Sequence, residues 1–428
     1  MKTSKVASRT AVEPRNDLLT DDQLLDLVQR QTFRYFWEGA HPVSALALDR
    51  HARQGNGGDA PVAIGGSGFG ALALIVACER RWVTRRQTLA RFNRMLDCLE
   101  QARRYHGTYP HLIRGDTGAT IAFGPLDDGG DLVETAFLFQ GLLCARAYFD
   151  GTGTAETQLR ERITHLWDAV EWRWFIQEGR HALTWHWSPI HGFARNFEIR
   201  GWNECLIAYV LAAGSPRYPI PPDAYHEGWA RGRDFLNGQS YEGIELPLGP
   251  NWGGPLFFAH FSFCGLDPRG LRDRYADYFR QCVSHTRINY TYCVRNPRDY
   301  RGYGPACWGL SASDSIEGYV AHAPDNDLGV ITPAAALSSF VYTPAEALAA
   351  LRHFYEDLGA RIWGRFGFVE AFSEQRGWYA DSYVAINEGP LVNMIENYRS
   401  GLIWKLFMRI PEVQSGLRAL GFSSPYLA

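Results

Sequence analysis

The chain has 428 residues, of which 46% are hydrophobic, and this apolar content is sufficient to bury a large core and excludes a disordered protein. Its 43 basic and 46 acidic side chains give a net charge of −3, which excludes the basic surface expected of a nucleic-acid-binding protein. No stretch approaches about 18 consecutive apolar residues, so the sequence predicts no membrane span.

The first predicted helices follow from apolar spacing and end signals. Leu24, Leu27, Val28 and Tyr35 recur on one helical face. A second helix is expected over Gly70–Arg81, where nearly every side is apolar. Thr84 and Gln87 form a capping-box pattern at the start of a third helix, which Gly107 is expected to close.

Six further stretches have helical patterns, and strand-like alternation is scarce, with Thr184–Trp187 as the one candidate hairpin arm. The six stretches are Asp131–Phe149, Glu156–Ile176, Asn203–Ala213, Leu271–Cys293, Pro344–Leu358 and Val392–Met408. No linker divides the chain. We therefore expect one all-α domain over residues 19–428, preceded by a loosely attached segment over residues 1–18, and the many amphipathic helices suit a closed double ring.

The eight cysteines are scattered without a CxxC spacing, and the 13 histidines show no HExxH pattern. These patterns favour buried reduced thiols and predict no metal and no cofactor. The segment from Met1 to Asn16 lacks an apolar signal-peptide core, so we expect a cytoplasmic protein, or a periplasmic one if a leader was removed.

Aromatic residues are abundant, with 14 Trp, 21 Tyr and 24 Phe making up 14% of the chain. Large rings can fill a wide helical core. They can equally form the walls of a sugar-binding cleft, where the C–H face of a pyranose stacks on a ring. Composition alone is compatible with both interpretations.

The most distinctive local pattern places four acids within eight residues, just before an apolar helix. These acids are Asp127, Asp128, Asp131 and Glu134. Acids at the start of a helix can simply cap it and interact favourably with its dipole, which accounts well for Asp131. Capping does not require four acids, and the two intervening glycines allow a ligand to approach the backbone closely.

A second acid, Glu204, lies far away in sequence, where Trp202 and Asn203 precede another apolar run. A carboxyl group at such a helix start is either a cap or a half-buried acid whose pKa is raised, so that it holds a proton. Two acidic sites of this kind, one of them beside a tryptophan, favour glycoside chemistry with two carboxyl groups.

Other candidates are less specific. Trp187 and His186 could form a sugar platform or core, Asp314 follows Trp308 in a glycine-rich stretch, and Glu388 precedes the last long helix. The glycine-rich segment Ile64–Gly70 has no lysine after it, which argues against a phosphate-binding loop.

These motifs resemble those of a known family, the glucoamylase-like (α/α)6-barrel domain of bacterial β-1,2-glucan-active enzymes, of the glycoside hydrolase family 144 type. The similar stretches are Thr32–Trp37, Ile64–Gly70, Asp127–Thr135, Trp202–Leu206, Gly254–Phe261, Cys307–Asp314, Tyr342–Phe354 and Met394–Phe407. The resemblance implies an (α/α)6 barrel. It also implies that Asp127, Asp131, Glu134 and Glu204 are catalytic, with Glu204 as the general acid and Asp131 as our first choice for the base.

The resemblance further implies a hydrolase of β-1,2-glucan or sophoro-oligosaccharides. We expect Trp37, Trp187, Trp202 and Trp308 to form the cleft walls, and Asp128, Asn203, Asp314 and Glu388 to bind sugar hydroxyls. A transferase on the same scaffold and a non-catalytic sugar-binding protein are the alternatives. An inverting hydrolase separates its carboxyl groups by about 6.5–9.5 Å and a retaining one by about 5–5.5 Å, and inversion is the expectation from the family.

Overall fold

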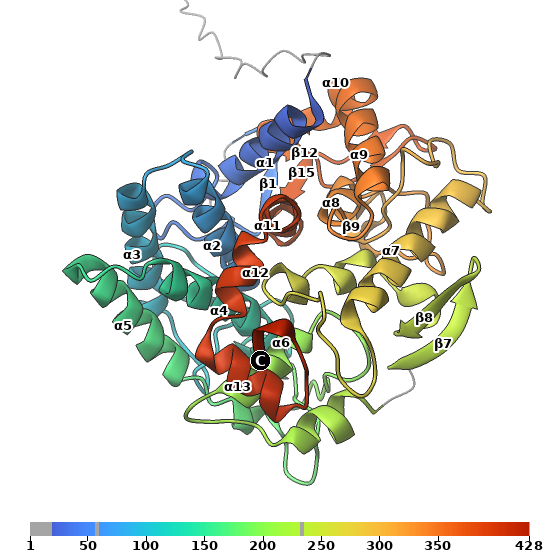
Figure 1. Ribbon diagram of the computed structural model, residues 1–428. Coiled ribbons are helices and arrows are strands. Elements are labelled where there is room, and N and C mark those ends of the chain that lie inside the picture. Colours follow the sequence, from blue (N-terminus) through green and yellow to red (C-terminus); the bar gives the residue numbers. More distant parts are fainter. Residues whose placement is uncertain (1–18, 56–59, 232–234, 428) are drawn as a thin grey trace, which may run out of the picture.

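The computed structural model describes residues 19–55, 60–231 and 235–427, so the predicted N-terminal segment 1–18 lies outside the described residues. Figure 1 shows a ring of helices around a helical centre. The α-helices are α1 (Asp21–Trp37), α2 (Ile64–Glu79), α3 (Arg85–Gln101), α4 (Leu132–Tyr148), α5 (Thr154–Asp168), α6 (Leu206–Gly214), α7 (Tyr278–Arg295), α8 (Pro333–Ser338), α9 (Pro344–Arg352), α10 (Gly359–Ile362), α11 (Ala385–Arg399), α12 (Leu402–Phe407) and α13 (Pro411–Ala419).

The strands are short and lie in loops between helices. They are β1 (Arg50–Ala52), β2 (Val62–Ala63), β3 (Leu112–Ile113), β4 (Thr120–Ile121), β5 (Gly130–Asp131), β6 (His186–Trp187), β7 (Leu236–Tyr241), β8 (Ile244–Leu248), β9 (Ala312–Ser315), β10 (Gly318–Ala321), β11 (Trp363–Gly364), β12 (Gly367–Phe368), β13 (Phe372–Ser373), β14 (Trp378–Tyr379) and β15 (Ser382–Val384). All pairings are antiparallel, in the orders β1-β15, β2-β3-β4, β5-β6, β7-β8, β9-β10, β11-β12 and β13-β14.

Burial separates the helices into an inner and an outer ring, which is the (α/α)6 barrel expected from the sequence. The inner helices α2, α4, α6 and α11 are buried almost all round. In contrast, α3 and α5 bury only one apolar stripe each, as a surface helix does. In Figure 1 the helices α1, α3, α5, α7 and α9 lie toward the rim, and α11 lies near the centre.

Several helices begin at the capping residues that the sequence contains. Thr20 and Thr84 each form a complete capping box with a glutamine three residues later, at the starts of α1 and α3. Asp131 caps α4, and its side chain accepts the backbone N–H groups of Val133 and Glu134. The predicted capping box and the predicted start near Asp131 are therefore confirmed.

The ends and interruptions differ more from the prediction. Gly107 does not close α3, which ends at Gln101; the glycine lies instead in a tight turn with φ of 77°. The predicted helix Glu156–Ile176 ends at Asp168, and Leu271–Cys293 begins only at Tyr278, where Asp277 caps α7. The predicted Val392–Met408 is two helices, α11 and α12, because Gly401 takes a left-handed conformation between them.

The glycine-rich segment before Gly70 is helical, so α2 begins at Ile64 and not at Gly70. Its glycines allow α2 to cross α4 at backbone contact: a Cβ atom at Gly68 would collide with the carbonyl oxygen of Phe137, and one at Gly141 with that of Gly68. The glycines therefore allow two helices to pack closely, and they do not indicate a loop.

One cluster of buried hydrophobic side chains extends from Leu24 to Phe422. All eight cysteines are free, and all except the half-buried Cys98 are buried, as predicted. No helix among the described residues is long and apolar enough to cross a membrane.

The amino ends of the inner helices meet at one end of the barrel. Hydrogen bonds of the first backbone N–H groups join each helix to a neighbouring loop: Ile64 of α2 to His111, Leu132 of α4 to Trp185, and Ala385 of α11 to Asp49. The short strand pairs β1-β15, β2-β3-β4 and β5-β6 hold these loops in place. We call this end the mouth of the barrel.

Candidate active site

Asp131 lies at the centre of the mouth and is fully buried. Its Oδ1 accepts the N–H groups of Val133 and Glu134 at 3.0 and 2.9 Å. Its Oδ2 lies 3.3 Å from Nδ1 of His111 and 3.6 Å from Nε2 of His186. Because both oxygens are engaged and no surface is exposed, the geometry argues against the expected role of Asp131 as the base that holds a water.

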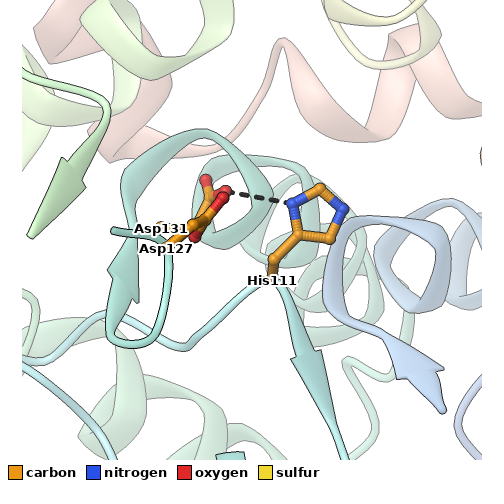
Figure 2. A group of neighbouring side chains, drawn as sticks. All are labelled: His111, Asp127 and Asp131. Atoms are coloured by element: carbon orange, nitrogen blue, oxygen red, sulfur yellow. Dashed lines mark hydrogen bonds and ion pairs between the residues drawn. The ribbon is translucent and has the colours of Figure 1, made fainter. Parts of the chain in front are cut away.

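Figure 2 shows His111 beside Asp131 and Asp127, with the ring nitrogen directed at the Asp131 carboxylate. Burial opposes protonation of His111, but the charge of Glu134 and the hydrogen bond and charge of Asp131 outweigh it and raise the pKa of the imidazole to about 10. At Asp131 burial acts to raise the pKa, but the same hydrogen bond, the charges of the two histidines and the backbone N–H of Glu134 together lower it. His111 is therefore a cation at neutral pH, and its ring stacks on Phe123 at 4.0 Å.

Asp127 and Asp131 pair with His111, His186 and Arg195, and we call these five residues the ion network. The Oδ2 of Asp127 lies 2.8 Å from Nη1 of Arg195 and 3.3 Å from Nε2 of His186, whereas its Oδ1 is buried without a hydrogen-bond partner among the described residues. Burial, and then the charge of Asp131, raise the pKa of Asp127 to about 6. Asp127 is thus ionised at neutral pH and has one oxygen available.

Glu134 faces α2 from the first turn of α4. Its Oε2 accepts the backbone N–H of Gly65 at 2.7 Å. A Cβ atom at position 65 would lie 2.6 Å from that oxygen, so a glycine is required for the contact. Burial raises the pKa of the Glu134 carboxyl, against the opposing charge of His111.

Glu204 lies just before α6, where Asn203 Oδ1 accepts the N–H of Cys205 at 3.0 Å. The hydroxyl of Ser262 donates to the Glu204 carbonyl and fixes the backbone. Burial raises the pKa of the Glu204 carboxyl to about 7, and the charges of Glu134 and Asp131 act in the same direction. The carboxyl group therefore holds a proton for part of the time near neutral pH.

A second cluster of acids lies at the amino end of α11, and we call Asp314, Glu370 and Glu388 the α11 acid cluster. Asp314 accepts from Arg50 at 3.3 Å and from the Ser382 hydroxyl. Asn387, next to Glu388, donates to Oε1 of Glu370 at 2.7 Å.

Both glutamates of the α11 acid cluster are deeply buried, and the Oε2 atom of each has no hydrogen-bond partner among the described residues. Burial, and then the charge of Asp314, raise the pKa of Glu370 to about 8. Burial and Glu370 raise the pKa of Glu388 well above its usual value. Glu370 is therefore protonated at neutral pH and can donate a hydrogen bond, and burial favours the protonated form of Glu388 in the same way.

His111, Asp127 and Asp131 offer three ligand atoms within 4.8 Å of one another, a set that could in principle hold a cation. In this structure the same atoms already pair with one another and with Arg195, so the two carboxylates are balanced by a protonated imidazole and a guanidinium. The set is sufficiently explained as an ion-pair network.

The predicted site residues are only partly brought together. Asp127, Asp128, Asp131 and Glu134 lie on one continuous segment, and Trp187 pairs with Gly130 beside them, half-buried against Tyr105 and His106. Asn203 adjoins Glu204, and Asp314 and Glu388 belong to the α11 acid cluster.

Three of the predicted wall tryptophans lie elsewhere. Trp37 ends α1 on the outside of the barrel, with the Arg91 guanidinium 4.3 Å from its ring. Trp202 packs against Trp229, Phe263 and Tyr278, and Trp308 is fully buried and donates to the carbonyl of Glu346. The prediction that these three rings form the cleft walls is wrong, because two of them fill the core and one covers the outer surface.

Sequence reasoning missed His111, Arg195 and Glu370, which are isolated residues in loops without a spacing signal. It named His186 as part of a sugar platform or core, and not as a partner of Asp131. Only the pairing of β5 with β6 brings His186 to Asp131, and only the return of the chain through β15 brings Glu370 to Asn387.

Comparison with known proteins agrees with this fold. The family model Glycoamylase, described as "Putative glucoamylase", matches residues 196–411. The endo-β-1,2-glucanase of Chitinophaga pinensis, solved with sophorotriose and glucose, is 50% identical, with a TM-score of 0.93 over 96% of this chain and 100% of that one. A structure from Bacteroides uniformis, named as a putative glucoamylase, is 54% identical, with a TM-score of 0.93 over 96% of this chain and 99% of that one.

The exo β-1,2-glucooligosaccharide sophorohydrolase of Parabacteroides distasonis is 43% identical over 423 residues. The alignment covers 94% of this chain but only 58% of that protein, so the chain spans less than two thirds of the length of this relative. The matches to the family model and to full-length solved structures place the chain in the glucoamylase-like (α/α)6-barrel family, of the glycoside hydrolase family 144 type.

Proposed function

We propose that the protein hydrolyses β-1,2-glucosidic bonds in β-1,2-glucan or sophoro-oligosaccharides. The observation that carries the proposal is the Glu204 carboxyl, buried at the mouth with a pKa of about 7, close to the charge of Asp131, whose own pKa is lowered. Similarity to the endo-β-1,2-glucanase and the sophorohydrolase supports the linkage.

In this proposal Glu204 is the general acid. Its proton passes to the glycosidic oxygen as the bond from the anomeric carbon breaks, and the leaving sugar departs as a neutral alcohol. A carboxyl group with a pKa near the working pH suits this step, because it is protonated in a substantial fraction of molecules and still donates readily.

Asp127 replaces Asp131 as the proposed base. Of the two aspartates that are bound to the histidines, Asp127 is the one with an oxygen free of protein partners, and its pKa of about 6 leaves it ionised at neutral pH. It accepts a proton from the water that attacks the anomeric carbon, while Arg195 and His186 fix its other oxygen. Asp131 positions both histidines and caps α4.

The α11 acid cluster supplies the substrate-binding groups. The unpartnered Oε2 of Glu370, protonated at neutral pH, can donate to a sugar hydroxyl, and the Asp314 carboxylate can accept from one. Burial favours the protonated form of Glu388, whose unpartnered Oε2 offers a second donor. Asp128 and Asn203 are next in sequence to Asp127 and Glu204 and add polar groups beside them, and Trp187 offers a half-buried ring.

The test is a product profile by mass spectrometry after incubation with linear β-1,2-glucan, with sophoro-oligosaccharides and, as controls, with starch and laminarin. We expect shortening of the β-1,2-linked substrates alone, with one new reducing end for each bond cut. Redistributed chain lengths without new reducing ends would indicate transfer, and intact substrates throughout would overturn the proposal.

The Glu204→Gln variant tests the acid. It keeps the size of the side chain and removes the titratable proton, so we expect a normal fold and a loss of turnover of about 100-fold or more. Glu161→Gln, on the exposed face of α5, is the matched control and should turn over like the wild type. Near-normal activity of Glu204→Gln would remove Glu204 from the mechanism.

A further inference from the structure

A pocket of about 530 Å³ lies outside the ion network and the α11 acid cluster, in the loop between α5 and α6. Its lining includes Trp174, Phe193, Arg173, Gln177 and Glu178. None of these residues has a role in the chemistry proposed above, and the pocket combines aromatic rings with side chains that carry donors and acceptors.

Trp174 is the main aromatic surface of this pocket and is 45% exposed. One face of its indole stacks on His106, with ring centroids 3.9 Å apart and planes at 12°. The Phe193 ring lies 6.5 Å away at 34°, so the two rings form an open angle. An exposed indole that is held rigidly from one side is the surface on which the C–H face of a pyranose stacks.

The polar side chains suit a neutral ligand with many hydroxyl groups. Within the described part of the chain, the Arg173 guanidinium and the Glu178 carboxylate have no hydrogen bond or ion pair, and both are exposed. Gln177 is held by its amide nitrogen, which donates to Thr184 and Asn196. Donors and acceptors of opposite charge therefore border the rings, and a sugar hydroxyl can both donate and accept.

The pocket is physically connected to the mouth. The other edge of His106 meets Trp187 at 4.8 Å and 86°, and Trp187 pairs with Gly130, the residue before Asp131. A glucan that leaves the mouth past Trp187 therefore finds a second aromatic surface on the same loop cluster.

We propose that the Trp174 pocket is a second carbohydrate-binding site, which holds uncharged glucosyl units of a β-glucan chain away from the bond that is cut. The inference rests on the proposed function for the identity of the glycan. The pocket increases affinity for long chains relative to short ones, because a chain held at two places dissociates more slowly than a chain held at one.

The experiment uses the full chain with Glu204→Gln as an inactive background. Long linear β-1,2-glucan and sophorotriose are titrated by calorimetry into this protein, with and without Trp174→Ala. Loss of one ring stack should raise the Kd for the long glucan by about tenfold and change the Kd for sophorotriose much less. Trp174→Phe, which keeps a ring, should recover part of the affinity.

The control is Tyr398→Ala at the end of α11, because Tyr398 is 44% exposed and so matches Trp174 in exposure. It should bind the long glucan as the background protein does, and circular dichroism checks that each variant is folded. An unchanged Kd for the long glucan in Trp174→Ala overturns the inference, even if the wild type cleaves the glucan. If the wild type cleaves no β-1,2-glucan but the background protein binds it through Trp174, the proposed hydrolase fails and the binding site stands.

Discussion

At the scale of single residues, the surroundings at the mouth give side chains of the same type very different pKa values. His111 and His186 both lie within 3.6 Å of Asp131 Oδ2. Burial lowers the pKa of His186 to about 4, whereas the nearby Glu134 and Asp131 overcome burial at His111 and raise its pKa to about 10. One histidine is neutral and the other is charged, so the aspartate is held from two sides while the network carries a single imidazolium.

Glu370 gives a prediction about stability. Its pKa is about 8 in the folded protein and about 4.5 in the unfolded chain, so the folded state binds the extra proton between these values. Stability from this group is complete below about pH 4.5 and is lost as pH rises toward about 8, at about 1 kcal/mol per pH unit. Glu370→Gln cannot ionise and should remove that slope.

Urea unfolding at several pH values between about 5 and 8 measures the effect, as the difference between the wild type and Glu370→Gln at each pH. Glu161→Gln should retain the wild-type slope, since Glu161 lies on the exposed face of α5. Parallel curves for the wild type and Glu370→Gln would mean that Glu370 is ionised in the folded protein.

At the scale of elements, the sequence shows where helices begin more reliably than where they end. Capping residues act locally, so Thr84 and Asp131 are readable from their neighbours. The helical state of Ile64–Gly70 depends on α4, a partner about seventy residues away whose backbone needs the space that glycines leave. Propensity therefore predicts a loop there, and tertiary packing overrides it.

Gly68→Ala tests this helix crossing. The added methyl group would collide with the carbonyl of Phe137, and backbone atoms cannot rotate away as side chains can. We expect a loss of stability of about 3 kcal/mol, measured as a lower urea midpoint. Gly153→Ala, at the N-cap of α5 with φ of −67° and no atom within 4 Å of the new Cβ, is the matched control and should stay close to wild type. Equal midpoints for the two variants would show that α2 and α4 have room to separate.

At the scale of the whole molecule, the net charge is only −3, but many of the acidic side chains discussed above are gathered at the mouth. The amino ends of α4, α6 and α11 bring together acids that are separated by up to 261 residues, from Asp127 to Glu388. Asp131, Glu204 and Glu388 were recognisable from the sequence because each lies next to the start of a predicted helix. The proximity of the segments, and the burial that shifts their pKa values, arise only when the double ring closes.

The combined electrostatics of the mouth predict a bell-shaped dependence of kcat/KM on pH. Activity requires Asp127 ionised and Glu204 protonated, so it should fall as pH drops below about 6, where Asp127 gains a proton, and as pH rises above about 7, where Glu204 loses one. The measurement is kcat/KM for a sophoro-oligosaccharide from about pH 4 to about pH 9. Arg195→Gln should move the acidic limb to higher pH, since the Arg195 guanidinium stabilises the Asp127 carboxylate at 2.8 Å. A profile that rises steadily to high pH would show that no buried carboxylic acid donates the proton.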